Sequence, residues 1–195
     1  SHVVSSTGTD TYSSVSASIG SLKGPLHGGA NCMVSNMIED IKKNCSYTNE
    51  EFLKEYIRKI FMGEAFDRSG KVYGMGHAIY TLSDPRAVIL KKKAYELAKE
   101  KGQLEEFELF SNVEKFTKEI GKELKGENFE ICANVDLYSG FVYKLLNIPT
   151  NIFTPLFALA RIASWNAHRI EQITSDKKII RPAYKAIDVH GKLLT

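Results

Sequence analysis

Apolar side chains recur at steps of three and four along most of this 195-residue chain, which is the spacing of one face of an α-helix. No segment alternates convincingly between apolar and polar residues over five or more positions, and no pair of strand-like runs flanks a two-residue turn. The pattern therefore predicts an all-α protein with about seven helices. The expected helices lie at about 11–22, 33–43, 48–61, 85–101, 107–125, 134–146 and 153–173.

Capping patterns predict where two of these helices begin. Thr48, with Glu51 three residues later, is typical of a capping box. Asp84 followed by proline resembles an N-cap with proline at the first helical position, which would place Arg86 in the first turn. The helix that begins near Thr48 is expected to bury Phe52, Tyr56, Ile57, Ile60 and Phe61.

Composition argues against several classes of protein. The net charge of +3 arises from 26 basic and 23 acidic residues spread along the chain, too small an excess to indicate a nucleic-acid partner. The longest uncharged stretches, such as 151–160, are shorter than the roughly 20 apolar residues of a membrane-spanning helix. Three cysteines cannot all pair within one chain and no apolar leader precedes them, so a cytoplasmic location is expected. Neither they nor the five histidines have metal-ligand spacing, so no metal site is expected.

Two histidines lie within glycine-rich turns, where a ligand can approach the backbone closely. His27 precedes Gly28 and Gly29 at a predicted helix start, and His77 follows the segment 74–76, which reads Gly-Met-Gly. A neutral imidazole at such a helix start can donate a hydrogen bond to an oxygen that is acquiring negative charge. The alternative for each is a histidine that only caps a turn.

Asp136 and three arginines complete the set of candidate residues. Asp136 begins a predicted helix, either as a first-turn carboxylate favoured by the helix dipole or as a desolvated base for a weak carbon acid. Arg161 lies in a mostly apolar helix and needs a partner there, either a dicarboxylate ligand or an internal carboxylate. Arg86 and Arg181 are further candidates. His168 and His190 are interpreted as structural or surface residues.

Taken together and in chain order, these segments resemble the citrate synthase family. The matching segments are 21–31 (SLKGPLHGGAN), 74–77 (GMGH) with 84–86 (DPR), 134–136 (NVD) with 139–140 (SG), 156–161 (LFALAR) and 181–182 (RP). They extend over nearly the whole chain. The resemblance implies a citrate synthase-like, all-α helical fold.

The resemblance also implies a reaction, the condensation of acetyl-CoA with oxaloacetate and water in the tricarboxylic acid cycle. By this resemblance Asp136 takes a proton from the methyl group of acetyl-CoA, His27 stabilises the enol, and His77 polarises the oxaloacetate carbonyl. The implied oxaloacetate-binding residues are Arg86, Phe157, Arg161 and Arg181, the last donated across a homodimer. The implied CoA-binding loop consists of Val72, Tyr73, Gly74, Met75 and Gly76. The family needs no tightly bound cofactor, since acetyl-CoA is a co-substrate.

The resemblance further implies a domain order, with two departures. Residues 1–26 would be a remnant of the large domain, 27–145 the small domain, and 146–195 the return to the large domain. An oxaloacetate-binding histidine common in the family would lie before this chain begins. Thr81 stands where the family often has a basic residue near a CoA phosphate. The chain thus resembles the C-terminal portion of the enzyme, with little activity expected of it alone.

Three alternatives remain open at this point. A 2-methylcitrate synthase, which uses propionyl-CoA, would share every quoted segment, and citryl-CoA lyases are a second group of relatives. From a different class, the chain could be a CoA-binding or dimerisation module without catalysis. The apolar, small-residue helix over 11–22 favours that last alternative, because such a face suits helix pairing between subunits.

Overall fold

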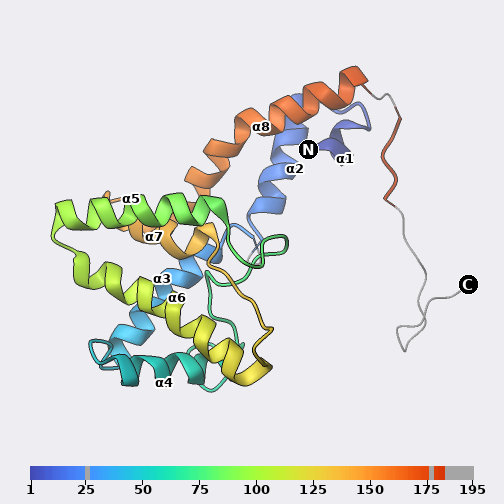
Figure 1. The fold of residues 1–195 in the computed structure, drawn as a ribbon. Helices are drawn as coiled ribbons and strands as arrows, with labels where there is room; N and C mark the ends of the chain where they lie inside the picture. The colour runs from blue at the N-terminus through green and yellow to red at the C-terminus, as the bar shows by residue number, and fades with distance from the viewer. Residues whose placement is uncertain (25–26, 176–177, 183–195) are drawn as a thin grey trace, which may run out of the picture. The chain divides into compact units, whose positions relative to one another are not determined.

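The computed structural model describes residues 1–24, 27–175 and 178–182, and every regular element in these ranges is helical (Figure 1). The all-α prediction is therefore confirmed. Within the described ranges, no helix combines the length and the apolar character needed to cross a membrane. The elements are α1 (His2–Ser5), α2 (Thr11–Leu22), α3 (Ala30–Asn44), α4 (Glu50–Phe61), α5 (Pro85–Lys101), α6 (Leu104–Lys125), α7 (Val135–Leu145), η1 (Thr150–Ile152) and α8 (Phe153–Ser175).

The chain divides into two compact units. Unit 1 consists of Ser1–Lys23 and the residues from Phe157 onward, and it contains α1, α2 and most of α8. Unit 2 is Gly24–Leu156, with α3 to α7 and the start of α8. The finer division at 26 and 145 that the family resemblance implies stays a prediction.

The core of unit 2 is built around α7, which packs against α5 on one side and α3 on another. Helices α5 and α7 run side by side in Figure 1, and α6 packs on both α4 and α5. Close contact between α3 and α7 depends on Gly140, because a Cβ there would lie 3.0 Å from Ser35 Oγ and 3.4 Å from the Asn31 carbonyl oxygen. Fully buried side chains of this core include Val34, Met37, Ile41, Leu53, Ile57, Ile60, Val113, Ile120, Leu137 and Tyr138.

The start of α4 differs from the sequence-based prediction by one residue. Its N-cap is Asn49, whose Oδ1 accepts hydrogen bonds from the N–H groups of Glu51 (2.9 Å) and Phe52 (3.2 Å), so the capping box predicted at Thr48 is wrong. An asparagine amide serves this purpose as well as a hydroxyl.

The buried face of α4 also differs from the prediction. Leu53, Ile57 and Ile60 form the buried stripe at steps of four and three, whereas Phe52 is 60% exposed. A residue next to the stripe is turned by about 100° on a helix, which puts Phe52 outside it. Tyr56 is partly buried at the edge of the stripe and donates a hydrogen bond to Asp40 Oδ2 at 2.7 Å.

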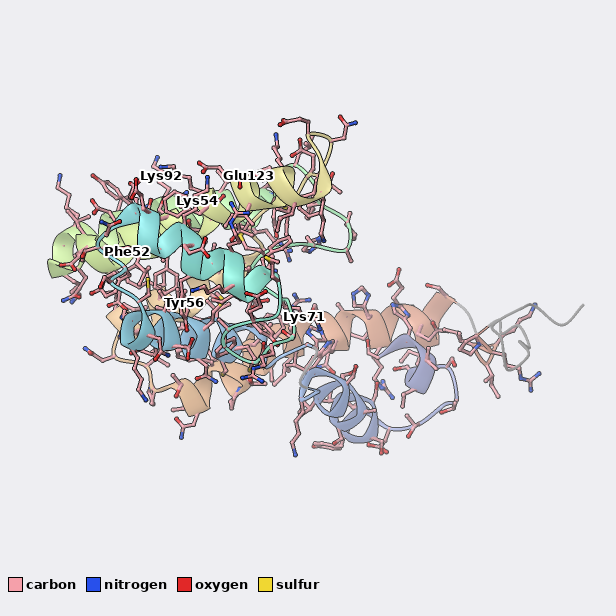
Figure 2. The ribbon with its side chains drawn as sticks, turned by 90° about the horizontal axis from the view of Figure 1, so that it is seen from below. Phe52, Lys54, Tyr56, Lys71, Lys92 and Glu123 are labelled. Atoms are coloured by element: carbon pink, nitrogen blue, oxygen red, sulfur yellow. The ribbon has the colours of Figure 1, made fainter. Side chains whose placement is uncertain are left out.

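Charged side chains link the exposed sides of α4 and α6. Lys54 of α4 pairs with both Glu119 and Glu123 of α6 at 2.9 Å, and Figure 2 shows the Lys54 and Glu123 side chains between the two helices. Arg58 pairs with the same Glu123. Surface pairs of this kind are worth at most about 1 kcal/mol each, so α4 is held mainly by its buried stripe.

In unit 1, polar contacts join α1, α2 and α8. The hydroxyl groups of Ser5 and Ser14 lie 2.8 Å apart in a buried contact between α1 and α2. From α8, Arg169 Nη2 donates a hydrogen bond to the Thr9 carbonyl oxygen at 3.0 Å. The predicted helix over 11–22 is confirmed as α2, capped by Asp10, which accepts from the Ser13 N–H.

Candidate active site

A short backbone pairing joins the glycine-rich loop 74–76 to the segment that precedes α7. Gly76 N–H donates to the Cys132 carbonyl oxygen at 2.7 Å, and Asn134 N–H donates to the Gly74 carbonyl oxygen at 2.9 Å. The Asn134 side chain adds a bond from Nδ2 to the Gly76 carbonyl oxygen at 2.8 Å. This pairing anchors the residue immediately before His77 to the N-terminus of α7.

The pairing requires glycine at position 74. Gly74 has φ +83°, and a Cβ on it would lie 2.8 Å from both the Cα and the Cβ of Leu137. The positive φ is strained for other residues, and the contact with the α7 backbone leaves no room for a side chain. The glycine therefore allows the loop to lie directly against α7.

Asp136 is the second residue of α7, and Asn134 is the N-cap. Asn134 Oδ1 accepts a hydrogen bond from the Asp136 N–H at 2.9 Å. This bond caps the helix and does not involve the Asp136 carboxylate. Burial raises the pKa of Asp136, and electrostatic attraction to His27, Arg86 and His77 acts in the opposite direction. The carboxylate thus lies within electrostatic range of all three groups and keeps a net raised pKa, as a base for a weak carbon acid requires.

The His77 ring is oriented by backbone donors. Its Nδ1 accepts hydrogen bonds from the N–H groups of Ile79 at 3.0 Å and Tyr80 at 3.1 Å. These two donors require a lone pair on Nδ1, so in the neutral ring the proton is assigned to Nε2. Arg86 Nη2 lies 3.1 Å from that Nε2. Two N–H donors then lie side by side, and an oxygen acceptor from a ligand would satisfy both.

Arg86 is held in place by Asp84. The Asp84 carboxylate, fully buried, accepts from the N–H, Nε and Nη2 of Arg86 at 3.0, 3.0 and 2.8 Å. These hydrogen bonds from Arg86 keep the pKa of Asp84 below its ordinary value. The predicted cap, with proline at the first position of α5, is confirmed. Because the arginine side chain is still 49% exposed, it can bind a ligand without leaving Asp84.

His27 lies in the turn between α2 and α3, where the sequence places it. Its N–H donates to the Gly24 carbonyl oxygen at 2.9 Å, and its own carbonyl oxygen accepts from the Ala30 N–H at 3.2 Å. The turn is tied to the start of α8 by Thr154, whose hydroxyl donates to the Gly28 carbonyl oxygen at 2.7 Å. The His27 residue is exposed.

A cavity of about 490 Å³ lies beside the glycine-rich loop. Its size is in the range of pockets for small-molecule and cofactor ligands. Of the five residues predicted to bind CoA, all but Gly76 line it. Two further lining residues, Ala30 and Asn134, belong to the segments 21–31 and 134–136 that carry the family resemblance. Sequence reasoning missed the rest of the wall, because it comes from segments without a recognisable motif. These residues include Met33, Phe61, Lys71, Lys125, Phe129 and Ile131.

One wall of this cavity combines two aromatic rings with a cation. Lys125 Nζ lies 5.0 Å from the ring centroid of Phe61 and 4.8 Å from that of Phe129. Lys71 lines the cavity as well. The wall can therefore stack against a flat ring and attract a phosphate.

The remaining predicted substrate residues belong to unit 1. The Arg161 guanidinium lies 4.9 Å from the ring centroid of Phe157, and Arg161 is exposed on α8, as is its apolar neighbour Leu159. Because Arg161 is exposed, water can hydrate its guanidinium in this chain, and the dicarboxylate ligand or internal carboxylate expected as its partner stays a prediction. Arg181 is exposed. His190 lies outside the described residues.

Comparison with known proteins gives consistent matches. Residues 1–183 match the family model described as citrate synthase, C-terminal domain. A citrate synthase from Synechocystis sp. is 42% identical over 190 residues, covering 97% of this chain and 43% of that protein. A 2-methylcitrate synthase from Shewanella oneidensis is 35% identical over 187 residues, covering 96% of this chain and 44% of that protein.

A solved structure matches the fold. It is the ternary complex of citrate synthase from Thermoplasma acidophilum with carboxymethyl coenzyme A and oxaloacetate, which aligns with a TM-score of 0.71 and 30% identity. The match covers 96% of this chain and 48% of that one. This chain therefore spans less than half the length of each of these relatives.

Proposed function

Because this chain belongs to the citrate synthase family, we propose that it carries the reaction centre of an enzyme that joins acetyl-CoA, oxaloacetate and water to give citrate and CoA. The observation that carries the proposal is the surroundings of Asp136. A half-buried carboxylate with a raised pKa lies within electrostatic range of two imidazoles and a guanidinium, all in unit 2.

The first step is removal of a proton from the methyl group of acetyl-CoA. A methyl group beside a thioester is a weak acid, so a carboxylate can deprotonate it only if the developing oxygen charge is stabilised. Asp136 takes the proton, and His27 donates a hydrogen bond to the thioester oxygen as the enol forms. A donor of this type contributes roughly 3 to 4 kcal/mol in related acyl chemistry.

The second step forms the carbon–carbon bond. The Nε2–H of His77 and the Arg86 guanidinium lie side by side, an arrangement that supports holding the carbonyl oxygen and a carboxylate of oxaloacetate. The enol carbon attacks the polarised carbonyl carbon, whose oxygen takes a proton and becomes the hydroxyl of citryl-CoA. Water then cleaves the thioester, which releases citrate and the CoA thiol.

The cavity beside the loop is proposed to take the CoA moiety. Its glycine-rich edge, the Phe61 and Phe129 rings and the two lysines suit an adenine with nearby phosphates. The relative from T. acidophilum was crystallised with carboxymethyl coenzyme A, which supports a CoA ligand for this chain. We propose no tightly bound cofactor for the condensation.

Oxaloacetate is further proposed to contact Phe157, Arg161 and Arg181, with Arg181 supplied by the second subunit of a homodimer. The exposed guanidinium groups of Arg161 and Arg181 suit a dicarboxylate.

The three cysteines, Cys32, Cys45 and Cys132, are unpaired, which supports placing the enzyme in the reducing cytoplasm, with a role in the tricarboxylic acid cycle.

Release of the CoA thiol by the full-length protein tests the proposal. Thiol release is expected only when acetyl-CoA and oxaloacetate are both present. A 2-methylcitrate synthase is the second candidate, favoured by the S. oneidensis relative, and faster release from propionyl-CoA than from acetyl-CoA would identify it. Absence of release from either thioester, in a protein that still binds CoA, would favour the module without catalysis.

A further inference from the structure

We propose that His2, His168 and Glu171 form a binding site for a divalent transition-metal ion in unit 1. His2 Nε2 lies 3.6 Å from Glu171 Oε2, and His168 Nδ1 lies 3.4 Å from the same oxygen. The three ligand atoms all lie within 4.8 Å of one another. Neighbouring ligands of a tetrahedral Zn²⁺ are roughly 3.3 to 3.4 Å apart, given bonds of about 2.0 to 2.1 Å. Two of the three separations are thus already close to those of a metal site.

A group outside the triad orients one of its ligands. His2 Nδ1 lies 3.0 Å from Oε1 of Gln172, a side chain that is only 7% exposed. The amide oxygen can only accept, so the ring proton belongs on Nδ1 and the lone pair on Nε2 faces Glu171. Metal-bound histidines usually donate their other ring N–H to a fixed acceptor, and Gln172 supplies this support before any ion binds.

The other two ligands are arranged by α8. His168 and Glu171 are three residues apart and share one face of the helix. The His2 ring lies against His168, with 4.8 Å between centroids and a tilt of 54°. Binding an ion would therefore require small side-chain rotations and would join α1 to α8 within unit 1.

The donor set selects the class of ion. Two imidazoles and one carboxylate suit Zn²⁺, Co²⁺ or Ni²⁺, whereas Mg²⁺ and Ca²⁺ prefer oxygen ligands alone. His168 and Glu171 are more than half exposed, which leaves room for water as a fourth ligand. The proposed condensation uses none of the three residues, so this site does not depend on the proposed function.

Calorimetric titration of Zn²⁺ into the 195-residue chain at neutral pH tests the site. We expect one equivalent to bind with a dissociation constant in the micromolar range or below, and to raise the melting temperature. Glu171→Gln and His168→Gln should each weaken binding at least tenfold. Both residues are exposed, so neither change removes core packing.

Two matched controls separate the triad from other ligands on the chain. Glu108→Gln, an exposed helix carboxylate on α6, and His27→Gln should leave Zn²⁺ affinity unchanged. Co²⁺ should bind without the near-ultraviolet charge-transfer band of a cysteine thiolate. Absence of stoichiometric Zn²⁺ binding, or affinity that is the same in Glu171→Gln as in the unchanged chain, would overturn the proposal.

Discussion

The raised pKa of Asp136 suits this residue for deprotonating carbon, and it also lowers the stability of the fold. Burial raises the pKa of the Asp136 carboxyl, and the electrostatic influence of His27, Arg86 and His77 offsets only part of that effect. An acid whose pKa is higher in the folded state than in the unfolded state lowers stability once the pH exceeds both values. The folded protein is therefore less stable with a charged carboxylate at position 136 than it would be with a neutral side chain there.

Asp136→Asn should consequently preserve or raise stability. At pH 7 we expect the variant chain to melt at the same temperature as the unchanged chain or higher. The difference in melting temperature between the two chains should shrink as the pH falls through the pKa of Asp136. The Asp136 carboxyl of the unchanged chain then becomes neutral, like the asparagine amide of the variant. Thermal melts from pH 7 to pH 3 measure this difference. A variant that is markedly less stable at pH 7 and regains stability in acid would contradict the assignment of a raised pKa.

Gly74→Ala should be more damaging than an alanine at another left-handed glycine. Both Gly74 and Gly102 have positive φ, but a Cβ meets the α7 backbone only at position 74, while nothing lies within 4 Å at position 102. Gly102→Ala should cost roughly 1 to 2 kcal/mol of strain. Gly74→Ala adds an overlap worth about 1 to 3 kcal/mol more. Urea unfolding of the two variants compares them, and equal losses would show that the loop does not press on α7.

Among the elements, α5, α6 and α7 are joined by one carboxylate, Glu114 of α6. It accepts hydrogen bonds from Lys91 of α5 (2.8 Å), Lys118 (2.6 Å) and the Tyr138 hydroxyl of α7 (2.7 Å). Burial alone would raise the pKa of Glu114, but the hydrogen bonds from Lys118, Lys91 and Tyr138 outweigh it and lower the pKa to about 2. The helices that carry Arg86 and Asp136 are thereby tied together.

The pH dependence of stability should reveal this link. A carboxyl with a depressed pKa stabilises the fold above its unfolded value, near 4.5, and loses that contribution as the pH falls toward about 2. Glu114→Gln should thus lower the free energy of unfolding at pH 7 by on the order of 3 kcal/mol. The difference in free energy of unfolding between the unchanged chain and Glu114→Gln should narrow between pH 4.5 and 3. Urea titrations at several pH values measure it, and a difference independent of pH would refute the link.

Helix features that depend on neighbouring residues could be predicted from the sequence, and features that depend on packing could not. The Asp84 cap of α5 follows from neighbouring residues and is confirmed, and α7 begins at Val135, one residue after the start expected at about 134. The α4 face was misjudged at Phe52, because periodicity does not show which of two adjacent apolar residues faces the core. Sequence spacing relates His168 to Glu171, three residues later, but His2 lies at the other end of the chain, so ligand-spacing rules could not bring the three together.

For the whole molecule, the central fact is that this chain spans less than half the length of the citrate and 2-methylcitrate synthases compared above, yet holds the proposed base, both imidazoles and the cavity within unit 2. The lining of the cavity comes entirely from this unit, and the core of unit 2 is continuous. The candidate catalytic residues and the candidate CoA loop were found from short motifs, and their roles stay predictions. Phe129 and Lys125 could not be found in this way, because only the tertiary fold brings them to the cavity wall.

CoA binding should therefore persist in the 195-residue chain alone. Lys125→Glu should weaken the binding of CoA at least tenfold in calorimetry, because it places a negative charge on the cavity wall beside the proposed position of the phosphates. Lys99→Glu, on the exposed side of α5, makes the same charge change away from the cavity and should have little effect. Equal losses in the two variants would mean that overall charge, not the cavity, attracts CoA.

The central proposal for this molecule is that Asp136 acts as a carbon base beside His27 and His77. The exchange of the acetyl-CoA methyl protons with deuterium oxide, followed by NMR in the full-length protein with an unreactive dicarboxylate in place of oxaloacetate, measures this step alone. Exchange should be catalysed by the unchanged protein and fall by roughly 10² to 10⁴ in Asp136→Asn. Exchange at the same rate in both proteins would contradict the account.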